Sequence, residues 1–380
     1  MQTPYFVIHK EKLDSLMEEL RNALNKHWPN SVTGYSFKTN SLSWLIRYME
    51  EAGYYAEVVS GDEYQLAKCH SFRSRVIYNG PIKSKTTFLE AVENGCIVNI
   101  DSKREIRWLL EADISAAVGL RVNFDLEKYC PGESQCGSEG GRFGFCYENG
   151  ELSAVLSELE GTKIKLAGLH LHCSSKTRST GIYKAIANVC CEIKQKYRLT
   201  LDYMDIGGGF FGGVPGKPDF NEYLEQISGI LQGCFDKEKT KLILEPGISL
   251  VGAPMDYVTS VVDVKDTTYN RFVITDGSRM NVDPLMRREA YSFHINYKDH
   301  AREKKEKQVV SGYTCMENDR LFILRDAPEL REGDLVVYEK VGAYTMCLSP
   351  LFIEYFPDVY LEENGKLTKI RERWTVEKVL

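Results

Sequence analysis

The pattern of apolar and polar positions predicts alternating strands and helices over about the first 250 residues. An early helix is indicated by an apolar stripe at helical spacing, formed by Leu13, Leu16, Met17, Leu20 and Leu24. Runs with the character of buried strands follow at residues 31–37, 54–60, 75–79, 96–101, 114–122, 165–172, 203–206 and 241–244. Between most of these runs lie further apolar stripes at helical spacing.

Alternating strands and helices are typical of α/β proteins, which form either doubly wound sheets or closed barrels. The count of eight strand-like runs favours a (β/α)8 barrel of the TIM type, in which functional side chains lie where strands end and loops begin. We predict this barrel over residues 25–255. The segment 125–141, rich in Gly, Ser and Glu, is predicted to be a loop insertion and a candidate lid.

After residue 251 the pattern changes to β-type runs separated by turn residues, with few helical stripes. These runs are residues 257–264, 271–275, 308–310, 320–324 and 335–341. We therefore predict a second, mainly β domain over residues 256–380. A short apolar strand at residues 3–9 is assigned to this domain, although spacing alone does not show the pairing.

Composition narrows the classes of partner. The chain has 380 residues, a formal net charge of −6 and no persistent basic cluster, which argues against a nucleic acid or an anionic membrane as partner. No apolar run reaches the roughly 18 residues of a membrane span, and no secretory leader is expected at the start of the chain. The eleven cysteines are scattered without a CxxC pair, which predicts reduced thiols in a cytoplasmic protein rather than a zinc site.

Two charged residues follow strands of the predicted barrel. An amine at Lys38, at the mouth of a buried strand, is partly desolvated and is a candidate for Schiff-base chemistry; a solvated lysine is the plain alternative. Glu245 closes the run 241–244, and Pro246 holds it extended. Such an acid is costly to bury unless it meets a cation or a proton donor, for which a protonated ring nitrogen is suitable. The alternative is an exposed acid at a turn.

Two further patterns follow barrel strands. His170 and His172 are two residues apart, so on a strand they point to the same side. They could be a pair of metal ligands, an imidazole that packs on a flat cofactor, or buried structural histidines. No third ligand at metal spacing supports the first option. Gly207, Gly208 and Gly209 leave backbone N–H groups uncovered, which suits an anion, or they form only a glycine-rich turn. No P-loop lysine follows these glycines, so a phosphate on a small cofactor fits best.

Together these patterns supply a lysine amine, a flat imidazole, a phosphate cradle and a carboxylate for a pyridinium. Pyridoxal 5′-phosphate requires these groups on one barrel face. We therefore predict pyridoxal 5′-phosphate as the cofactor and no metal.

The chain resembles the fold-type III pyridoxal-phosphate decarboxylases, the group of the diaminopimelate, ornithine/arginine and carboxynorspermidine decarboxylases. The resemblance covers nearly the whole chain. It rests on the segments 37–40 (FKTN), 58–63 (VVSGDE), 79–84 (NGPIKS), 141–144 (GRFG), 170–175 (HLHCSS), 207–210 (GGGF), 245–247 (EPG), 312–315 (GYTC) and 342–344 (GAY).

The resemblance implies a role for each matching residue. Lys38 would carry the cofactor, His172 would stack on its ring and Glu245 would pair with its ring nitrogen. The cofactor phosphate would be bound by Ser175, Gly207, Gly208, Gly209 and Tyr344. Cys315 would enter the site of a partner subunit and protonate the carbon that has lost CO2. The resemblance therefore implies a homodimer with shared active sites.

Two positions near the substrate depart from the family pattern. Ile248 stands where Arg is common after EPG, and Met316 stands where an acid is common after the motif cysteine. Arg287 with Tyr291 resembles the diaminopimelate-type block, in which the arginine grips a distal carboxylate. We predict decarboxylation of an amino acid or its derivative that is diaminopimelate-like, in an altered distal pocket. The predicted substrate-binding residues are Arg287, Tyr291, Glu317 and Asp319.

Two other functions are compatible with parts of this pattern. A racemase or epimerase would use the same cofactor but would need two bases. A non-catalytic barrel that binds pyridoxal phosphate would not need the β domain with its cysteine motif.

Overall fold

A computed structural model describes residues 1–349 and 351–379. The chain divides into two compact units. The barrel unit contains residues 16–38 and 42–249, and the β unit contains residues 1–15, 39–41 and 250–380. Among the described residues, no helix is long and apolar enough to cross a membrane.

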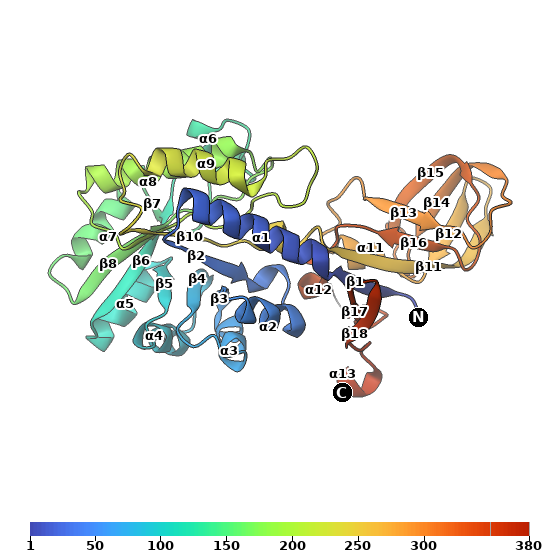
Figure 1. Cartoon of the computed structure of the whole chain (residues 1–380), viewed down its shortest axis with the longest axis horizontal. Helices are drawn as coiled ribbons and strands as arrows, with labels where there is room; N and C mark the ends of the chain where they lie inside the picture. The colour runs from blue at the N-terminus through green and yellow to red at the C-terminus, as the bar shows by residue number, and fades with distance from the viewer. Residues whose placement is uncertain (350, 380) are drawn as a thin grey trace. The chain divides into compact units, whose positions relative to one another are not determined.

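Parallel strands close into an eight-stranded barrel in the barrel unit, which confirms the predicted (β/α)8 fold (Figure 1). Neighbouring strands around the barrel are β5, β4, β3, β2, β10, β9, β8 and β6, and β6 pairs back to β5. Their bounds are β2 Ser31–Ser36, β3 Tyr55–Ser60, β4 Val76–Ile82, β5 Ile97–Ile100, β6 Ala116–Asn123, β8 Ile164–His170, β9 Tyr203–Asp205 and β10 Lys241–Leu244. The short strand β7 (Phe145–Cys146) pairs with β6 outside the closed ring.

Helices alternate with these strands along the chain, as the apolar stripes predict. They are α1 Lys10–His27, α2 Ser43–Glu51, α3 Gly61–Cys69, α4 Lys85–Glu93, α5 Lys103–Ala112, α7 Glu151–Leu159, α8 Thr180–Lys196, α9 Phe220–Leu231 and α10 Ile248–Val251. Several begin at a capping side chain: Ser60 accepts from a backbone N–H of α3, and Asp219 forms a capping box with Glu222 at α9. The predicted loop 125–141 contains a one-turn helix, α6 (Leu126–Tyr129).

The β unit is built on a sheet with the order β15, β14, β12, β11, β1, β17, β18, in which β16 also pairs with β11 and β13. Its strands are β1 Tyr5–His9, β11 Met255–Asp266, β12 Arg271–Thr275, β13 Phe293–Asn296, β14 Lys304–Ser311, β15 Arg320–Pro328, β16 Leu335–Tyr338, β17 Asp358–Glu363 and β18 Lys366–Arg371. Short helices α11 (Arg279–Val282), α12 (Thr345–Leu348) and α13 (Val376–Val379) complete it. The N-terminal strand β1 lies between β11 and β17 in this sheet.

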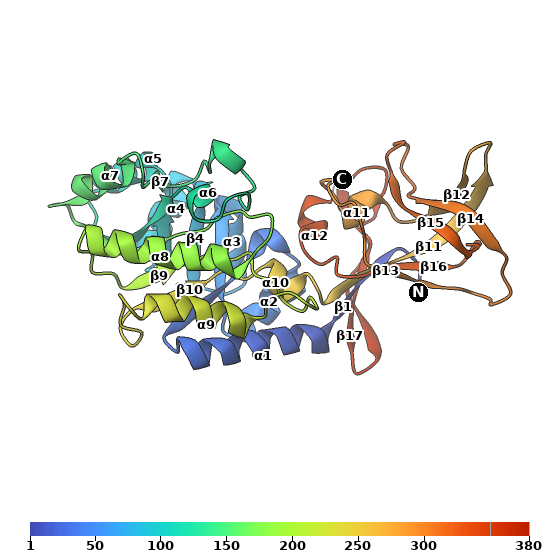
Figure 2. The same cartoon turned by 90° about the horizontal axis from the view of Figure 1, so that it is seen from above.

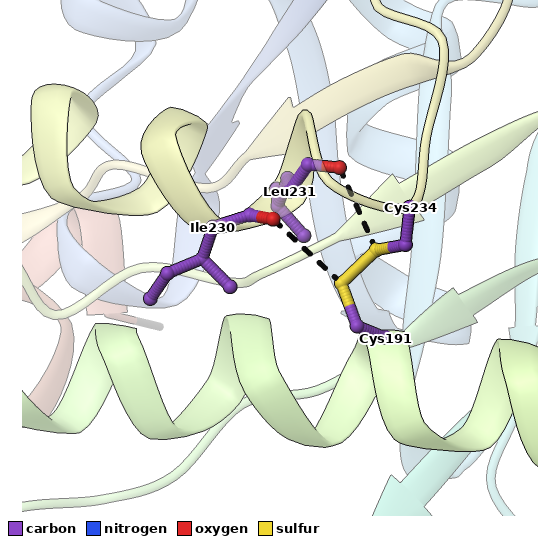
Figure 3. Close-up of a disulfide and its surroundings, with 4 residues drawn as sticks. All are labelled: Cys191, Ile230, Leu231 and Cys234. Carbon is purple, nitrogen blue, oxygen red and sulfur yellow. Dashed lines mark hydrogen bonds between the residues drawn. A yellow bond between two sulfur atoms is a disulfide. The ribbon is translucent and has the colours of Figure 1, made fainter.

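A disulfide corrects the expectation that all cysteines are reduced thiols. Cys191 on α8 and Cys234 after α9 are bonded, with their Cα atoms 5.9 Å apart (Figure 3). Helices α8 and α9 pack against each other on the barrel (Figure 2), which brings together two thiols that are 43 residues apart in sequence. The spacing of cysteines along the chain carries no sign of this packing. The other nine cysteines are free.

Candidate active site

The barrel brings the predicted cofactor residues to the ends of neighbouring strands. Lys38 lies in a 3-10 turn directly after β2, and Glu245 directly follows β10. The glycines Gly207–Gly209 follow β9, and His172 lies two residues past β8. Because β2, β10, β9 and β8 are consecutive neighbours in a parallel sheet, their carboxyl ends meet at one mouth of the barrel.

Lys38 forms an ion pair inside this mouth. Its amine contacts a carboxylate oxygen of Glu57, a residue of β3 that is 1 % exposed. Ser36 and Asn79 donate hydrogen bonds to the same carboxylate, over 2.6 and 3.1 Å. Burial raises the pKa of Glu57, but the charge of Lys38 and these hydrogen bonds outweigh burial and hold the pKa below its ordinary value. Glu57 is therefore an anion that anchors the lysine amine.

Two buried asparagines connect this ion pair to the end of β10. The Asn79 amide also donates to Glu245 Oε1 over 2.5 Å, and its oxygen accepts from Asn99 over 2.9 Å. Asn99 in turn donates to Asp205 Oδ2 over 3.0 Å. A continuous hydrogen-bonded network of side chains therefore runs across the interior from β3 to β9.

Glu245 and Asp205 form a buried pair of acids at the end of this network. Burial raises the pKa of Asp205 to about 6, although hydrogen bonds from Glu245 and the Gly207 N–H oppose the rise. Burial, then the charges of Asp205 and Glu57, raise the pKa of Glu245 well above its ordinary value. Glu245 is therefore the member of the pair that holds a proton.

His170 lies beside the acid pair. One oxygen from each acid and one ring nitrogen of His170 lie within 4.8 Å of one another, close enough for three atoms that share a metal ion. Burial, followed by the charge of Arg121, lowers the pKa of His170 well below its ordinary value. Since both acids accept hydrogen bonds from amides, we interpret the group as an acid pair beside a neutral imidazole.

The glycine turn forms a tight cradle against His172. Gly207 and Gly209 adopt φ angles of +68° and +91°, which side chains disfavour. A Cβ on Gly207 would lie 2.5 Å from His172 Nδ1, and one on Gly208 would lie 2.1 Å from the Glu245 carbonyl oxygen. Burial, then the charge of Arg121, lowers the pKa of His172 to about 3, so its imidazole is neutral.

His172 also lines a cavity of about 200 Å3 in the barrel unit. The cavity lies against the segment 125–141, and its other lining residues include Arg121, Ser134, Arg142, Phe143 and Ser174. Ser175 is half-buried, and its hydroxyl accepts a hydrogen bond from the Arg178 N–H over 3.1 Å.

In the β unit, Cys315 is exposed and lines a cavity of about 280 Å3. Asp319 is 2 % exposed and holds the turn before this cysteine. Its carboxylate accepts hydrogen bonds from the Thr314 hydroxyl and N–H, the Ser278 hydroxyl and the Arg279 N–H. Glu317 differs, since its side chain is 96 % exposed and pairs with Arg320.

A second carboxylate, Asp283, holds the segment that carries Arg287 and Tyr291. The Tyr291 hydroxyl donates to Asp283 over 3.1 Å and accepts from Arg279 Nε over 3.0 Å. Asp283 also accepts from the backbone N–H groups of Arg287 and Arg288. Tyr291 is thus engaged within the segment, whereas the guanidinium of Arg287 is exposed and has no ion-pair partner among residues 1–349 and 351–379.

Tyr344 follows β16 in the β unit and has a φ angle of +65°, unusual for a residue with a side chain. Its N–H donates to the carbonyl oxygen of Thr39 over 2.8 Å, and Thr39 is the residue that follows Lys38 in the chain. Its side chain is partly exposed.

Comparison with known proteins decides the family. Residues 12–252 match the family model described as "Pyridoxal-dependent decarboxylase, pyridoxal binding domain". The chain belongs to the pyridoxal-dependent decarboxylases. This confirms the predicted family and the predicted class of enzyme, a carboxy-lyase that decarboxylates an amino acid with pyridoxal phosphate.

Several relatives match this decarboxylase over nearly its whole length. The diaminopimelate decarboxylase of Aquifex aeolicus is 26 % identical over 385 residues, covering 98 % of this chain and 89 % of the relative. The L-glutamyl-[BtrI acyl-carrier protein] decarboxylase of Niallia circulans is 26 % identical over 408 residues, covering 100 % and 93 %. Among solved structures, the diaminopimelate decarboxylase of Methanocaldococcus jannaschii in complex with L-lysine superposes with a TM-score of 0.85 at 24 % identity, covering 99 % and 91 %, which supports the fold.

The residues of the barrel mouth fit the cofactor that this family name implies. Pyridoxal phosphate needs an amine, a partner for a ring nitrogen, a flat packing surface and a phosphate cradle. Lys38 supplies the amine, and Glu245 supplies a carboxyl group that holds a proton. His172 has a buried ring nitrogen without a hydrogen-bond partner, and the glycine turn beside it leaves no room for a Cβ.

Sequence reasoning missed the residues that support this decarboxylase site. Glu57, Asn79 and Asn99 were not predicted, although an acid inside the apolar run 54–60 was a visible signal for Glu57. Asp283 was not singled out either. These side chains contact the predicted residues from other strands or turns, so their roles depend on the fold.

We expect Asp319 to fix the backbone around Cys315 in the decarboxylase. Asp319→Ala removes the acceptor of four hydrogen bonds and should lower the free energy of unfolding by about 2–3 kcal/mol. Alkylation of Cys315, followed by mass spectrometry, should become several-fold faster. The matched control is Glu317→Ala, which removes an exposed acid two residues away. Equal alkylation rates in both variants would contradict this role.

Proposed function

We propose that this decarboxylase binds pyridoxal 5′-phosphate through Lys38 and removes CO2 from an amino acid that carries a distal carboxylate. The observation that carries the proposal is the convergence of Lys38, Glu245 and Gly207–Gly209 at the ends of neighbouring strands. A working homodimer, with Cys315 supplied by the partner subunit, is part of the proposal.

The barrel residues would each hold one part of the cofactor. When bound, pyridoxal phosphate supplies the electron sink that accepts the charge left as CO2 departs. Lys38 Nζ is the point of covalent attachment, and Glu57 holds this amine at the mouth of the barrel. Glu245 provides the carboxyl group for the ring nitrogen, and neutral His172 provides a flat surface without adding a charge.

The phosphate would be held by backbone and hydroxyl groups. Gly208 and Gly209 present N–H groups in a turn that no Cβ covers, and Gly207 shapes this turn while its own N–H donates to Asp205. Tyr183 braces the turn by donating to the Gly208 carbonyl oxygen over 3.0 Å. The hydroxyls of Ser175 and Tyr344 are the further proposed donors. Ile248, where the family commonly has Arg, leaves these neutral groups with a larger share of phosphate binding.

Cys315 is the proposed proton donor to the carbon that has lost CO2. Its thiol is exposed on a turn that Asp319 fixes, so it can approach a group outside its own unit. A thiol is a competent general acid when it is held close to the carbon that it protonates.

The exposed guanidinium of Arg287 is the proposed grip on a distal carboxylate, since arginine binds carboxylates through two parallel hydrogen bonds. The name of the diaminopimelate decarboxylase relative supports a substrate of this type, because diaminopimelate has a second carboxylate. Glu317 is exposed and would exchange its pairing with Arg320 for a substrate amine. Asp319 and Tyr291 are occupied by their own hydrogen bonds and would act by shaping the pocket.

A panel of amino acids tests the substrate class. Release of CO2 should be fastest with meso-diaminopimelate or another amino acid with a distal carboxylate, and slow with lysine, ornithine or arginine. Arg287→Ala should raise KM for the preferred substrate by about 10- to 100-fold with little change in kcat, because a charge-assisted hydrogen bond is worth about 1.5–3 kcal/mol. Arg288→Ala is the matched control. Fastest turnover of a basic amino acid, or equal effects of both substitutions, would contradict the proposed substrate class.

Hybrid dimers test the shared site. Lys38→Ala and Cys315→Ala chains should each be inactive alone, and random mixing should restore about a quarter of wild-type activity, because half of the dimers then contain one intact site of two. The fraction of hybrids is measured with differently tagged chains. Hybrid dimers that form without any recovery of activity would mean that each chain completes its own site.

A cytoplasmic location stays a prediction. Nine of the eleven cysteines are free, as is usual in a reducing compartment. The disulfide between Cys191 and Cys234 is unusual in such a compartment.

A further inference from the structure

Two buried acids, Asp205 and Glu245, lie at the ends of β9 and β10, and only Glu245 is among the predicted site residues. Asp205 is 0 % exposed, and Glu245 and His170 are 6 % and 2 % exposed. Both ring nitrogens of His170 lack a hydrogen-bond partner, and its Nε2 lies 3.7 Å from Glu245 Oε2. The two acids are therefore buried side by side next to an imidazole that neither donates to them nor accepts from them.

Two carboxylates this close in a low dielectric cannot both be charged without a cation between them. Lys38 is a cation whose charge acts on Glu245, and it is paired with a third acid, Glu57. The acid pair therefore carries one negative charge and one proton in the cofactor-free barrel.

The hydrogen bonds decide which acid is charged. Asp205 accepts from the Gly207 N–H over 2.9 Å and from the Asn99 amide over 3.0 Å, and these donors stabilise an anion. Glu245 accepts from the amide of Asn79. With Asp205 charged, the remaining proton stays on Glu245 and points to the Asp205 carboxylate.

Neighbouring groups do not take this proton away. His170 stays neutral because burial disfavours its charged form, and Arg121, His172, Lys38 and Lys83 add to the effect. Glu57 opposes ionisation of both acids of the pair. Tyr203 faces Asn99 from β9 and donates its hydroxyl proton to the Asn99 oxygen.

We propose that Asp205 is a positioning residue that keeps one proton on Glu245, ready for transfer to the ring nitrogen of the cofactor. This inference rests on the proposed role of Glu245. With the cofactor bound, the O–H bond of Glu245 would break as an N–H bond forms with the lone pair of the ring nitrogen. Two carboxylates and one cation would result, so the net charge of the group would stay at −1. Glu245 would thus supply this proton without drawing one from water.

Difference infrared spectra of cofactor-free protein test the first half of the inference. Wild type should show a protonated carboxyl C=O band at neutral pH that disappears in Glu245→Gln. The spectrum of Glu245→Gln is subtracted from that of wild type, because Glu105 is also a buried carboxyl group and absorbs in the same region. In Asp205→Asn, which keeps an oxygen for the Gly207 N–H, the band should titrate about one to two pH units lower, because the neighbouring negative charge is gone. Glu105→Gln is the matched control, since it removes another buried acid of the barrel and leaves Asp205 and its hydrogen-bond donors in place.

Proton uptake during cofactor binding tests the second half. Calorimetry in two buffers of different ionisation enthalpy is done at a pH where free pyridoxal phosphate has lost its ring proton. Wild type should take up fewer protons than Asp205→Asn, and an analogue with carbon in place of the ring nitrogen should abolish the difference. This readout does not involve decarboxylation, so it stands even if the proposed substrate class fails.

Three results would overturn the inference. They are the absence of a Glu245-dependent band in wild type, an unchanged titration in Asp205→Asn, and equal proton uptake by wild type and Asp205→Asn. If Asp205→Asn does not fold, the comparison of wild type with Glu245→Gln still decides whether Glu245 holds the proton.

Discussion

Replacing Lys38 by alanine is expected to lower kcat/KM for decarboxylation by about a thousand-fold or more, a loss of about 4 kcal/mol in transition-state stabilisation. The substitution removes the amine to which the cofactor would attach. In wild type, borohydride should fix the cofactor on Lys38, as detected by peptide mass spectrometry. A label on another lysine, or near-normal turnover of Lys38→Ala, would mean that Lys38 is not the attachment point of the cofactor.

The same substitution should change how stability depends on pH. In wild type the pKa of Glu57 is held below its ordinary value, so its contribution to stability is present above the ordinary pKa and is lost as pH falls. Without Lys38, burial raises the pKa of Glu57, and stability is then lost as pH rises. Lys38→Ala should therefore be more destabilised at pH 7.5 than at pH 5. We expect about 2 kcal/mol at pH 7.5, because Lys38 is 41 % exposed and the pair is partly screened.

Lys83→Met is the matched control for breaking a buried pair. Lys83 and Glu105 form an ion pair in the same barrel, 3.1 Å apart, with both side chains fully buried. This variant should lose stability in urea titrations yet still accept the borohydride label on Lys38. Loss of the label in Lys83→Met would mean that damage to the barrel, rather than loss of the attachment point, explains the Lys38 variant.

The barrel could be predicted because its signal is local. Each strand is a short apolar run between helical stripes, and the ends of those runs carry the residues with unusual chemistry. Lys38, Glu245 and the glycines could be read in this way because each follows a strand directly. Parallel strands end on the same face of a barrel, so position along the chain was enough to place them together.

The polar network could not be predicted because its members lie inside strands. Asn79 and Asn99 on β4 and β5 point into the barrel between acids from β3, β9 and β10. Whether a polar side chain within a strand faces solvent or another polar group depends on register and strand order, and neither is visible in one sequence. The same limit explains the pair Cys191–Cys234, which forms only because α8 and α9 are neighbours.

In the β unit, some strands were missed although a signal was present. The hairpin of β17 and β18 turns at Asn364 and Gly365, both with positive φ, and Asn-Gly is the preferred sequence for a two-residue hairpin turn. Its strands are rich in charged residues, so they do not form the apolar runs from which the other strands were predicted. The strand β14 extends to Lys304, beyond the predicted run 308–310, for the same reason.

Glu245→Gln is expected to retain the cofactor and to slow CO2 release about a hundred-fold, a change of about 3 kcal/mol in the barrier. The charge left as CO2 departs must be accepted by the ring, and a protonated ring nitrogen accepts it best. A carboxylate in contact with that nitrogen keeps it protonated by stabilising the charged form. Cofactor content is measured by absorbance after denaturation, and CO2 release is measured per loaded site.

Glutamine is the informative replacement because it keeps the packing of the acid pair. Its amide oxygen can accept from Asn79, and its amide N–H can donate toward Asp205, so the hydrogen bonds of protonated Glu245 are preserved. What is lost is the ability to exchange a proton with a ring nitrogen. Glu105→Gln is the control for changing a buried acid of the same barrel, and it should affect stability more than turnover per loaded site. Near-normal turnover of loaded Glu245→Gln would mean that another group meets the ring nitrogen, and the decarboxylation mechanism proposed for this site would lose its electronic basis.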